Sequence, residues 1–179
     1  MTILASESPR RRELIKKITQ DFTVIPANID ESVLHIPACD LPGELSKLKA
    51  YDVFAKHPDD KVLACDTVVI LDGEIMGKPH TKEKASEMLH KLSGKKHVVI
   101  SGYTLISKEK EITRTVRTYV CFNELSDELI ERYIASGSPM DKAGAYGIQD
   151  KEFNLVNHIE GSLDNVIGLP TEDLKEHWF

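Results

Sequence analysis

The sequence lacks several features that would assign it to common protein classes. No stretch of its 179 residues approaches the roughly 18 consecutive apolar residues that span a bilayer. No charged segment followed by an apolar run resembles a secretion signal at the start of the sequence. A basic excess is also missing, since the formal net charge is −6, and one tryptophan and five phenylalanines offer little stacking on bases. We therefore expect neither a membrane protein nor a nucleic-acid-binding protein.

Cysteine is scarce, and the cysteines are not clustered. Cys39, Cys65 and Cys121 are scattered, and none belongs to a C-x-x-C motif. The seven histidines are also scattered and form no H-E-x-x-H pair. An odd, dispersed set of cysteines argues against a disulfide framework and against a structural zinc site. The sequence thus predicts reduced thiols and a cytoplasmic location.

What the sequence does contain is a globular balance of 41% hydrophobic and 29% charged residues, without repeats or an obvious linker. We therefore expect a single domain over residues 1–179. Hydrophobic patterns predict strands at 2–5, 22–26, 62–71, 96–106, 112–122 and 153–159. They predict a helix from Ser8-Pro9 with Ser8 as its cap, a helix over 41–56 with Asp40 as its cap, a helix capped by Thr81, a helix over 126–136 and a short helix after Thr171. Asp72-Gly73 predicts a hairpin turn after the strand 62–71, and residues 137–149 form a glycine-rich loop. Because strands and helices do not alternate strictly, this order favours a mixed α/β or α+β sheet over a doubly wound parallel one.

Three arginines, Arg10, Arg11 and Arg12, fall in the first turn of the helix predicted from Ser8-Pro9. The helix dipole places partial positive charge at that end, so each cation is unfavourable there by roughly a few tenths of a kcal/mol. A bound anion reverses this sign. Arginine forks, free backbone N–H groups and the nearby serine hydroxyls would together bind a phosphate chain. The alternative is a solvated face of an exposed helix.

Asp66 lies in the middle of the most hydrophobic predicted strand, 62–71. A carboxylate in this position is costly unless it is paired, hydrogen-bonded or bound to a metal. Asp66 is therefore a candidate metal ligand or general base, and the alternative is a structural carboxylate in a salt bridge. Thr67 follows it and should point to the opposite face of the strand.

Two lysines are weaker candidates. Gly77-Lys78-Pro79 resembles the end of a P-loop, but the spacing from Gly73 is one residue short, and proline replaces the metal-binding Ser or Thr. Lys78 is therefore not a Walker lysine, although a lysine held between Gly and Pro can still reach a phosphate. Lys49 lies at the edge of the apolar stripe of the helix predicted over 41–56, where a lysine more often lies along the surface than catalyses.

The loop at 137–149 ends in Gln149, whose amide donor and acceptor could read the edge of a base. Gly144 and Gly147 permit the backbone to approach a ligand closely. For Asp141 and Lys142, a local ion pair that holds the loop is a simpler interpretation than direct catalysis.

Taken together, these clusters resemble the Maf family of nucleotide pyrophosphatases. The matching segments occur in the family's order across nearly the whole chain, and the ordered set is specific although each segment alone is weak. They are Ser6-x-Ser8-Pro9-Arg10-Arg11, Lys49-Ala50, Asp66-Thr67-Val68, Gly77-Lys78-Pro79, Leu92-Ser93-Gly94 with His97, the run from Asp141 to Gln149, and Asn165-Val166-Ile167-Gly168-Leu169-Pro170.

The resemblance implies one elongated α/β domain with a long mixed sheet and a cleft between two lobes, like that of ITPase. It implies hydrolysis of a nucleoside triphosphate to the monophosphate and pyrophosphate with a divalent cation, Mg²⁺ or Mn²⁺. By the same analogy Asp66 is the general base that activates water. The same carboxylate is also the predicted metal ligand, and it could serve as base, metal ligand or both. The implied substrate-binding residues are Ser6, Arg10, Arg11, Lys49 and Lys78 for the phosphates, with Arg11, Thr67 and Gln149 at positions tied to substrate choice. The ending Gly147-Ile148-Gln149 resembles the branch that prefers dTTP and UTP.

Other interpretations remain beside this one. The same chemistry could act on 7-methyl-GTP or on deaminated purine triphosphates, as in an enzyme that removes non-standard nucleotides. A non-catalytic nucleotide-binding regulator of cell division is a further alternative, against which the intact set of charged residues argues. The resemblance also implies a homodimer. Asp30 and Glu31 could supply carboxylates to a metal, but the segment after Glu31 departs from the family pattern, and Cys65 replaces the usual Ala.

Overall fold

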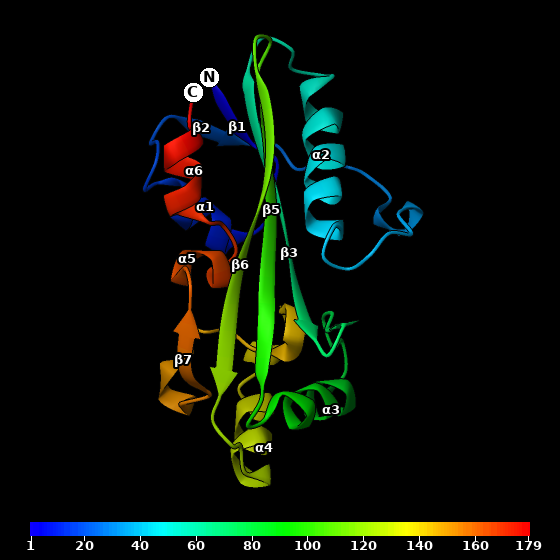
Figure 1. The fold of residues 1–179 in the computed structure, drawn as a ribbon, viewed down its shortest axis with the longest axis vertical. Helices are drawn as coiled ribbons and strands as arrows, with labels where there is room; N and C mark the ends of the chain where they lie inside the picture. The colour runs from blue at the N-terminus through cyan, green and yellow to red at the C-terminus, as the bar shows by residue number, and fades with distance from the viewer. The chain divides into compact units, whose positions relative to one another are not determined.

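A computed structural model describes residues 1–179 (Figure 1). The chain packs into two compact units. Unit 1 comprises Met1–Thr67, Ile100–Val116 and Asp164–Phe179, and unit 2 comprises Val68–Val99 and Arg117–Leu163. None of the helices combines the length and the apolar character that a membrane crossing requires. The single domain expected over 1–179 stays a prediction.

Seven strands form a mixed sheet. They are β1 Thr2–Leu4, β2 Phe22–Val24, β3 Lys61–Leu71, β4 Glu74–Ile75, β5 Lys96–Ile106, β6 Glu111–Phe122 and β7 Val156–Glu160. Their order is β2-β1-β3-β5-β6-β7, with β4 paired to β3. β1 runs parallel to β2 and β3, whereas β4 is antiparallel to β3 and β7 is antiparallel to β6. The predicted α/β class with a long mixed sheet is therefore confirmed.

The helices follow the predicted order, with two additions. The α-helices are α1 Pro9–Ile15, α2 Leu41–Phe54, α3 Lys82–Leu92, α4 Asp127–Ala135, α5 Leu163–Ile167 and α6 Thr171–His177. The 3₁₀ turns are Glu31–Val33, Ser138–Asp141, Ala143–Ala145 and Lys151–Phe153. The sequence did not predict α5 or the turn at Glu31–Val33, because each is too short to show a hydrophobic period. The turn at Lys151–Phe153 explains why β7 begins three residues later than predicted.

Unit 1 packs helices on both faces of its strands. The alternation of β3 directs Leu63 and Cys65 into a core with α1 and α6, and directs Val62 and Ala64 into a second core with α2. Figure 1 shows α2 on the opposite side of these strands from α1 and α6. Each face of β3 therefore has its own set of side chains on which a site can be built.

The two helices that flank this strand begin differently. Ser8 caps α1 as predicted, since its hydroxyl accepts the N–H of Arg11 at 3.3 Å. Asp40 holds the N-cap position of α2 as predicted, since its carbonyl accepts the N–H of Glu44 at 3.2 Å. Asp40 is itself in helical conformation (φ −92°, ψ −18°), and its side chain makes no capping hydrogen bond.

A contact between two glycines fixes where α2 lies in unit 1. Gly102 is on β5, and Gly43 is in the first turn of α2. A Cβ atom on Gly102 would lie 2.3 Å from the backbone nitrogen of Gly43 and 2.4 Å from the carbonyl carbon of Pro42. Only a residue without a side chain allows this approach.

Unit 2 contains the predicted hairpin and its two helices. Asp72 and Gly73 both adopt positive φ, +50° and +80°, as a two-residue hairpin turn of type I′ requires. The hydroxyls of Thr81 and Ser126 cap α3 and α4 by accepting the N–H groups of Lys84 and Leu129. The predicted hairpin turn and the predicted cap Thr81 are confirmed, whereas the cap Ser126 was not predicted.

The loop at 137–149 is held to the segment that follows β4. Gly144 adopts φ +73°, and its N–H donates to the carbonyls of Met76 and Gly77 at 2.9 and 3.1 Å. A Cβ atom on Gly144 would lie 3.0 Å from a methyl of Val69. The predicted glycine-rich loop is thus an ordered series of turns, and its glycine serves packing as well as conformation.

Candidate active site

Asp66 is held on β3 by a lysine. Its carboxylate Oδ1 accepts from the Lys49 ammonium at 2.9 Å, and the two side chains are only 13% and 14% exposed. Lys49 lies on α2, so the α2 face of β3 carries this pair. Burial alone would lower the pKa of Lys49, but the carboxylates of Asp66 and Glu31 outweigh it, and the pKa is raised. Lys49 is therefore a fixed ammonium and does not lie along the surface as a lysine in this position commonly does.

Glu31 completes this cluster. Its Oε1 lies 2.8 Å from the same Lys49 ammonium, although the Glu31 side chain itself is 54% exposed. The sequence identifies Glu31 only as a weak candidate metal ligand, and the 3₁₀ turn at Glu31–Val33 brings it to the lysine. Asp30 has a local task instead, since its Oδ1 accepts from the backbone and hydroxyl of Ser32 at 3.0 and 2.6 Å.

The residues of this cluster fit a hard divalent cation. Two carboxylates, Asp66 and Glu31, converge on one positive charge, and carboxylate oxygens are the ligands that Mg²⁺ and Mn²⁺ prefer. Two protein ligands leave most positions of a six-coordinate ion to water and to a substrate. This is the usual arrangement where a metal is bound together with phosphate oxygens.

Arg11 forms a second cluster on the opposite face of β3. Its guanidinium donates to the Gly168 carbonyl at 2.7 Å, to the Thr67 hydroxyl at 3.0 Å and to the Ser6 hydroxyl at 3.4 Å. Thr67 in turn shares a hydrogen bond of 2.7 Å with Ser101. The structure therefore brings together three predicted residues, Ser6, Arg11 and Thr67, and confirms that Thr67 and Asp66 face opposite ways.

Arg10 differs from its neighbour. Its side chain is half-buried and its guanidinium has neither a hydrogen-bond partner nor an ion pair within the protein. Five donors are thus available to an anion. Arg12 is exposed.

Sequence reasoning missed two members of the Arg11 cluster. Gly168 contributes a backbone carbonyl, and its only signal was its place in the segment 165–170. Ser101 gave no signal, because a single hydroxyl within a buried strand is common. Cys65, which replaces the usual Ala of the family, is fully buried, and burial raises the pKa of that thiol. It is therefore an unreactive core residue.

Two further predicted residues belong to unit 2. Lys78 is exposed just after β4, and Gln149 is exposed at the end of the loop 137–149. Neither makes a hydrogen bond or ion pair with the protein. Lys142 bonds to the Ser138 carbonyl at 2.7 Å and to Asp141 at 3.2 Å, so the predicted local role of this pair is confirmed.

His97, part of a matching segment in the sequence, has a structural role. Its Nε2 shares a hydrogen bond of 2.7 Å with the Tyr146 hydroxyl, and its ring packs edge-on against Phe122. Burial lowers the pKa of His97 to about 4, so the ring is neutral at pH 7. It fixes the base of the loop that leads to Gln149.

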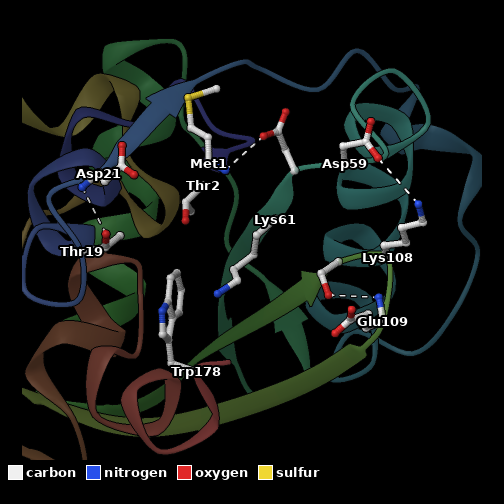
Figure 2. A pocket seen from close by; sticks show the side chains of 11 residues that line it. Met1, Thr2, Thr19, Asp21, Asp59, Lys61, Lys108, Glu109 and Trp178 are labelled. Atoms are coloured by element: carbon white, nitrogen blue, oxygen red, sulfur yellow. Dashed lines mark hydrogen bonds and ion pairs between the residues drawn. The ribbon is translucent and has the colours of Figure 1, made fainter.

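A cavity of about 570 Å³ lies elsewhere in unit 1 (Figure 2). Ion pairs occupy part of its lining, including the Met1 amino group with Asp60 at 3.2 Å, and the Lys61 ammonium lies 4.8 Å from the centre of the Trp178 ring. Its lining residues are Met1, Thr2, Thr19, Asp21, Asp59, Asp60, Lys61, Ser107, Lys108, Glu109 and Trp178. None of the predicted site residues is among them, so this cavity is not the candidate site.

The chain is similar to one protein family and to several named proteins. The family model for Maf-like proteins matches residues 1–177. A Thermosipho africanus protein named dTTP/UTP pyrophosphatase is 51% identical over 168 residues, which cover 94% of this chain and 86% of that protein. Proteins of the same name from Pyrococcus furiosus and Thermococcus gammatolerans are 47% and 46% identical, over 94% and 96% of this chain and 88% and 92% of theirs.

A more distant likeness comes from a solved structure, the Staphylococcus aureus Ham1 protein. It covers 70% of this chain and 72% of its own, with 18% identity and a TM-score of 0.49. A likeness at that level assigns no activity.

Proposed function

The chain belongs to the family of Maf-like proteins, and we propose that it hydrolyses dTTP and UTP to the nucleoside monophosphate and pyrophosphate. One observation supports this most directly: a nearly buried carboxylate, Asp66, is held by the fixed ammonium of Lys49. The relatives named dTTP/UTP pyrophosphatase supply the substrate class.

The reaction is an in-line attack of water on the α-phosphorus. A bond forms between the water oxygen and phosphorus, and the bond from phosphorus to the bridging α–β oxygen breaks. Pyrophosphate leaves with the electron pair of that bond. Asp66 accepts the proton of the attacking water through Oδ2, the oxygen that Lys49 does not bind. Lys49 fixes the orientation of the carboxylate, so the base is in position before the substrate arrives.

Positive side chains bind the triphosphate and stabilise the charge that develops on it. Lys49 and Arg11 are preorganised by their hydrogen bonds, and Arg10 has uncommitted donors. The family resemblance also implies Lys78, an exposed lysine, as a phosphate-binding cation. Because the net charge of the chain is −6, these individual cations and not the overall field must attract the substrate.

A divalent cation, Mg²⁺ or Mn²⁺, would be held by Asp66 and Glu31 and would polarise the phosphate oxygens when bound. Lys49 would then balance the part of the negative charge on Asp66 and Glu31 that the ion leaves uncompensated. Metal-dependent chemistry is expected of a pyrophosphatase of this family, and we propose Mg²⁺ or Mn²⁺ as the ion.

Selection between bases rests on Gln149, Arg11 and Thr67. The edge that uracil and thymine share offers one donor between two acceptors, and a single amide can both donate to it and accept from it. An amide at position 149 can therefore pair with uracil and thymine alike, and the methyl group that distinguishes them lies away from this edge. The preference for these two nucleotides over guanine nucleotides is supported by the named relatives and not by the amide alone. A homodimer and a cytoplasmic location remain predictions.

The proposal is tested by product identification with a panel of substrates. The purified chain is incubated with dTTP, UTP, CTP, GTP and 7-methyl-GTP, with and without Mg²⁺ or Mn²⁺. We expect metal-dependent release of one pyrophosphate per monophosphate from dTTP and UTP above the others. In ¹⁸O-labelled water the label should appear in the monophosphate. Turnover of 7-methyl-GTP alone would overturn the role of Gln149, and tight binding without turnover would favour a nucleotide-binding regulator.

A further inference from the structure

Three potential metal ligands meet on the last two strands of the sheet. Cys121 lies on β6, and His158 and Glu160 lie on β7. The sulfur, a ring nitrogen and a carboxylate oxygen all lie within 4.8 Å of one another. Cys121 is paired directly with His158 in the antiparallel register, and Glu160 is two residues further along β7, so all three side chains share one face.

A β-bulge next to this triplet changes the direction of one side chain. Cys121 pairs with His158, but the next residue, Phe122, pairs with Val156, which leaves Asn157 as the extra residue. In a regular strand Asn157 would point away from its neighbour. Here its side-chain oxygen lies 2.8 Å from Nδ1 of His158. Bulges commonly re-aim side chains next to functional sites.

A chain of amides determines which nitrogen of His158 carries the proton. The Asn123 amide nitrogen donates to the Asn154 backbone carbonyl at 2.9 Å, and the Asn157 amide nitrogen donates to the Asn123 oxygen at 3.0 Å. Because the chain ends on a carbonyl, which only accepts, each amide has one possible orientation. The Asn157 oxygen must therefore face His158 and accept from Nδ1–H. This leaves the lone pair on Nε2, the nitrogen that points toward Glu160.

A hydrogen bond also holds the carboxylate of Glu160 in position. Its Oε2 accepts from the Lys96 ammonium at 2.8 Å, while Oε1 lies 3.7 Å from Nε2 of His158. The hydrogen bond from Lys96 lowers the pKa of Glu160, so the carboxylate is ionised at neutral pH. Oε2 is thus held in place by Lys96, and Oε1 faces Nε2 of His158.

We propose that Cys121, His158 and Glu160 bind one divalent transition-metal ion of the Zn²⁺ type, with water as a fourth ligand. One sulfur, one nitrogen and one oxygen form a set suited to Zn²⁺ or Co²⁺ and unsuited to the hard ions expected at Asp66. Around a tetrahedral zinc ion such ligand atoms lie about 3.3–3.6 Å apart, so side-chain rotations alone bring the triplet into range. The hydrogen bond that Asn157 accepts from His158 is the second-shell contact that histidine ligands usually make.

Binding proceeds with loss of one proton. The Cys121 thiol releases it to the solvent as the sulfur–metal bond forms, and no oxidant or reductant takes part. The bound ion would join β7, the last strand in the sheet order, to β6. Since the ligands come from two strands, only the folded chain presents the site, and the ion should raise the temperature of unfolding.

Cobalt titration of the reduced full-length chain tests the proposal, because a cobalt–thiolate bond gives an absorption band that oxygen and nitrogen ligands do not. We expect one Co²⁺ per chain with this band, displaced by one Zn²⁺. Cys121→Ser should abolish the band, whereas the matched variant Cys39→Ser, at another half-exposed free cysteine, should keep it. Glu160→Gln should weaken binding at least tenfold, and Asn157→Ala should weaken it about 10–100-fold.

The result of the cobalt titration does not depend on the hydrolysis proposed for the Asp66 site. Asp66→Asn, which removes the carboxylate of the other site, should keep the full thiolate band. Absence of the band in the wild-type chain would overturn the proposal, as would a band that persists in Cys121→Ser. Equal affinities of the wild-type chain and Asn157→Ala would overturn the role of the bulge.

Discussion

Gly102→Ala is the substitution whose effect the structure defines most sharply. The added Cβ would meet three backbone atoms of the α2 start, at 2.3 Å from Gly43 N, 2.4 Å from Pro42 C and 2.6 Å from Gly43 Cα. Ordinary contact begins at 3.4 Å, so the shortest of these distances must grow by about 1 Å. Backbone atoms cannot rotate away as a side chain can. The first turn of α2 must therefore move off β5.

The size of the effect follows from two opposed terms. Overpacking of a close-packed contact costs about 1–3 kcal/mol, and more where the backbone must move. Alanine recovers about 0.4–1 kcal/mol by restricting the unfolded chain. We expect a net loss of about 2 kcal/mol or more, which lowers the unfolding temperature by roughly 4–8 °C for a chain of this length. Because α2 also carries Lys49, a shift of about 1 Å at its start should lower kcat by up to about 100-fold.

Two glycine variants serve as controls. Gly43→Ala places its Cβ 3.2 Å from a methyl of Thr115, a contact that a side chain can relieve, while alanine favours the helix by up to about 1 kcal/mol. It should stay within about 1 kcal/mol of the wild type. Gly77→Ala meets nothing within 4 Å and should change stability by less than about 0.5 kcal/mol. The free energies of unfolding of the three variants are measured in urea. A Gly102→Ala protein as stable as Gly77→Ala would show that a Cβ at position 102 does not clash with the start of α2.

Three further predictions concern His97, Arg11 and Tyr133. The pKa of His97 is lowered to about 4 from its ordinary 6.5, so the wild type should lose stability as the pH falls from 6.5 to 4, by up to about 3 kcal/mol. In His97→Gln the free energy of unfolding should depend less on pH between 6.5 and 4 than in the wild type. The same pH dependence in both proteins would contradict the lowered pKa of His97. Arg11→Lys should lower kcat/KM about 10–100-fold, because an ammonium cannot reach three separated oxygens; unchanged kinetics would remove Arg11 from the site. Tyr133→Phe should lower the free energy of unfolding by about 1–3 kcal/mol, since the hydroxyl bridges Asp150 and the Gly147 N–H; urea unfolding with no loss would show that water replaces the bridge.

The sequence predicted those parts of the site that local patterns encode. Asp66 stood out because a charge in the middle of an apolar strand needs a partner, and the structure supplies Lys49. Ser8 and Thr81 were predicted as caps from their type and position, and both accept the expected N–H groups. Asp40 occupies its predicted cap position, but its side chain makes no capping hydrogen bond, and the chain is already helical at that residue.

Contacts between distant segments were beyond the sequence. Glu31 reaches Lys49 through a three-residue turn too short to show a period, and Gly168 acts through a backbone carbonyl that any residue has. The triplet around Cys121 was also invisible. Its members are scattered in the sequence, and only the strand register and a bulge bring them together.

The most direct test of the account compares the turnover of dTTP by the wild type, Asp66→Asn and Asp72→Asn. Asparagine keeps the size of the side chain and removes its charge, and Asp72 is an exposed aspartate in the turn that follows the same strand. Both variants are first checked for wild-type folding by circular dichroism. We expect Asp66→Asn to lose at least about 100-fold in kcat, whereas Asp72→Asn keeps the wild-type rate. Wild-type turnover by a folded Asp66→Asn protein would contradict it and place the chemistry elsewhere.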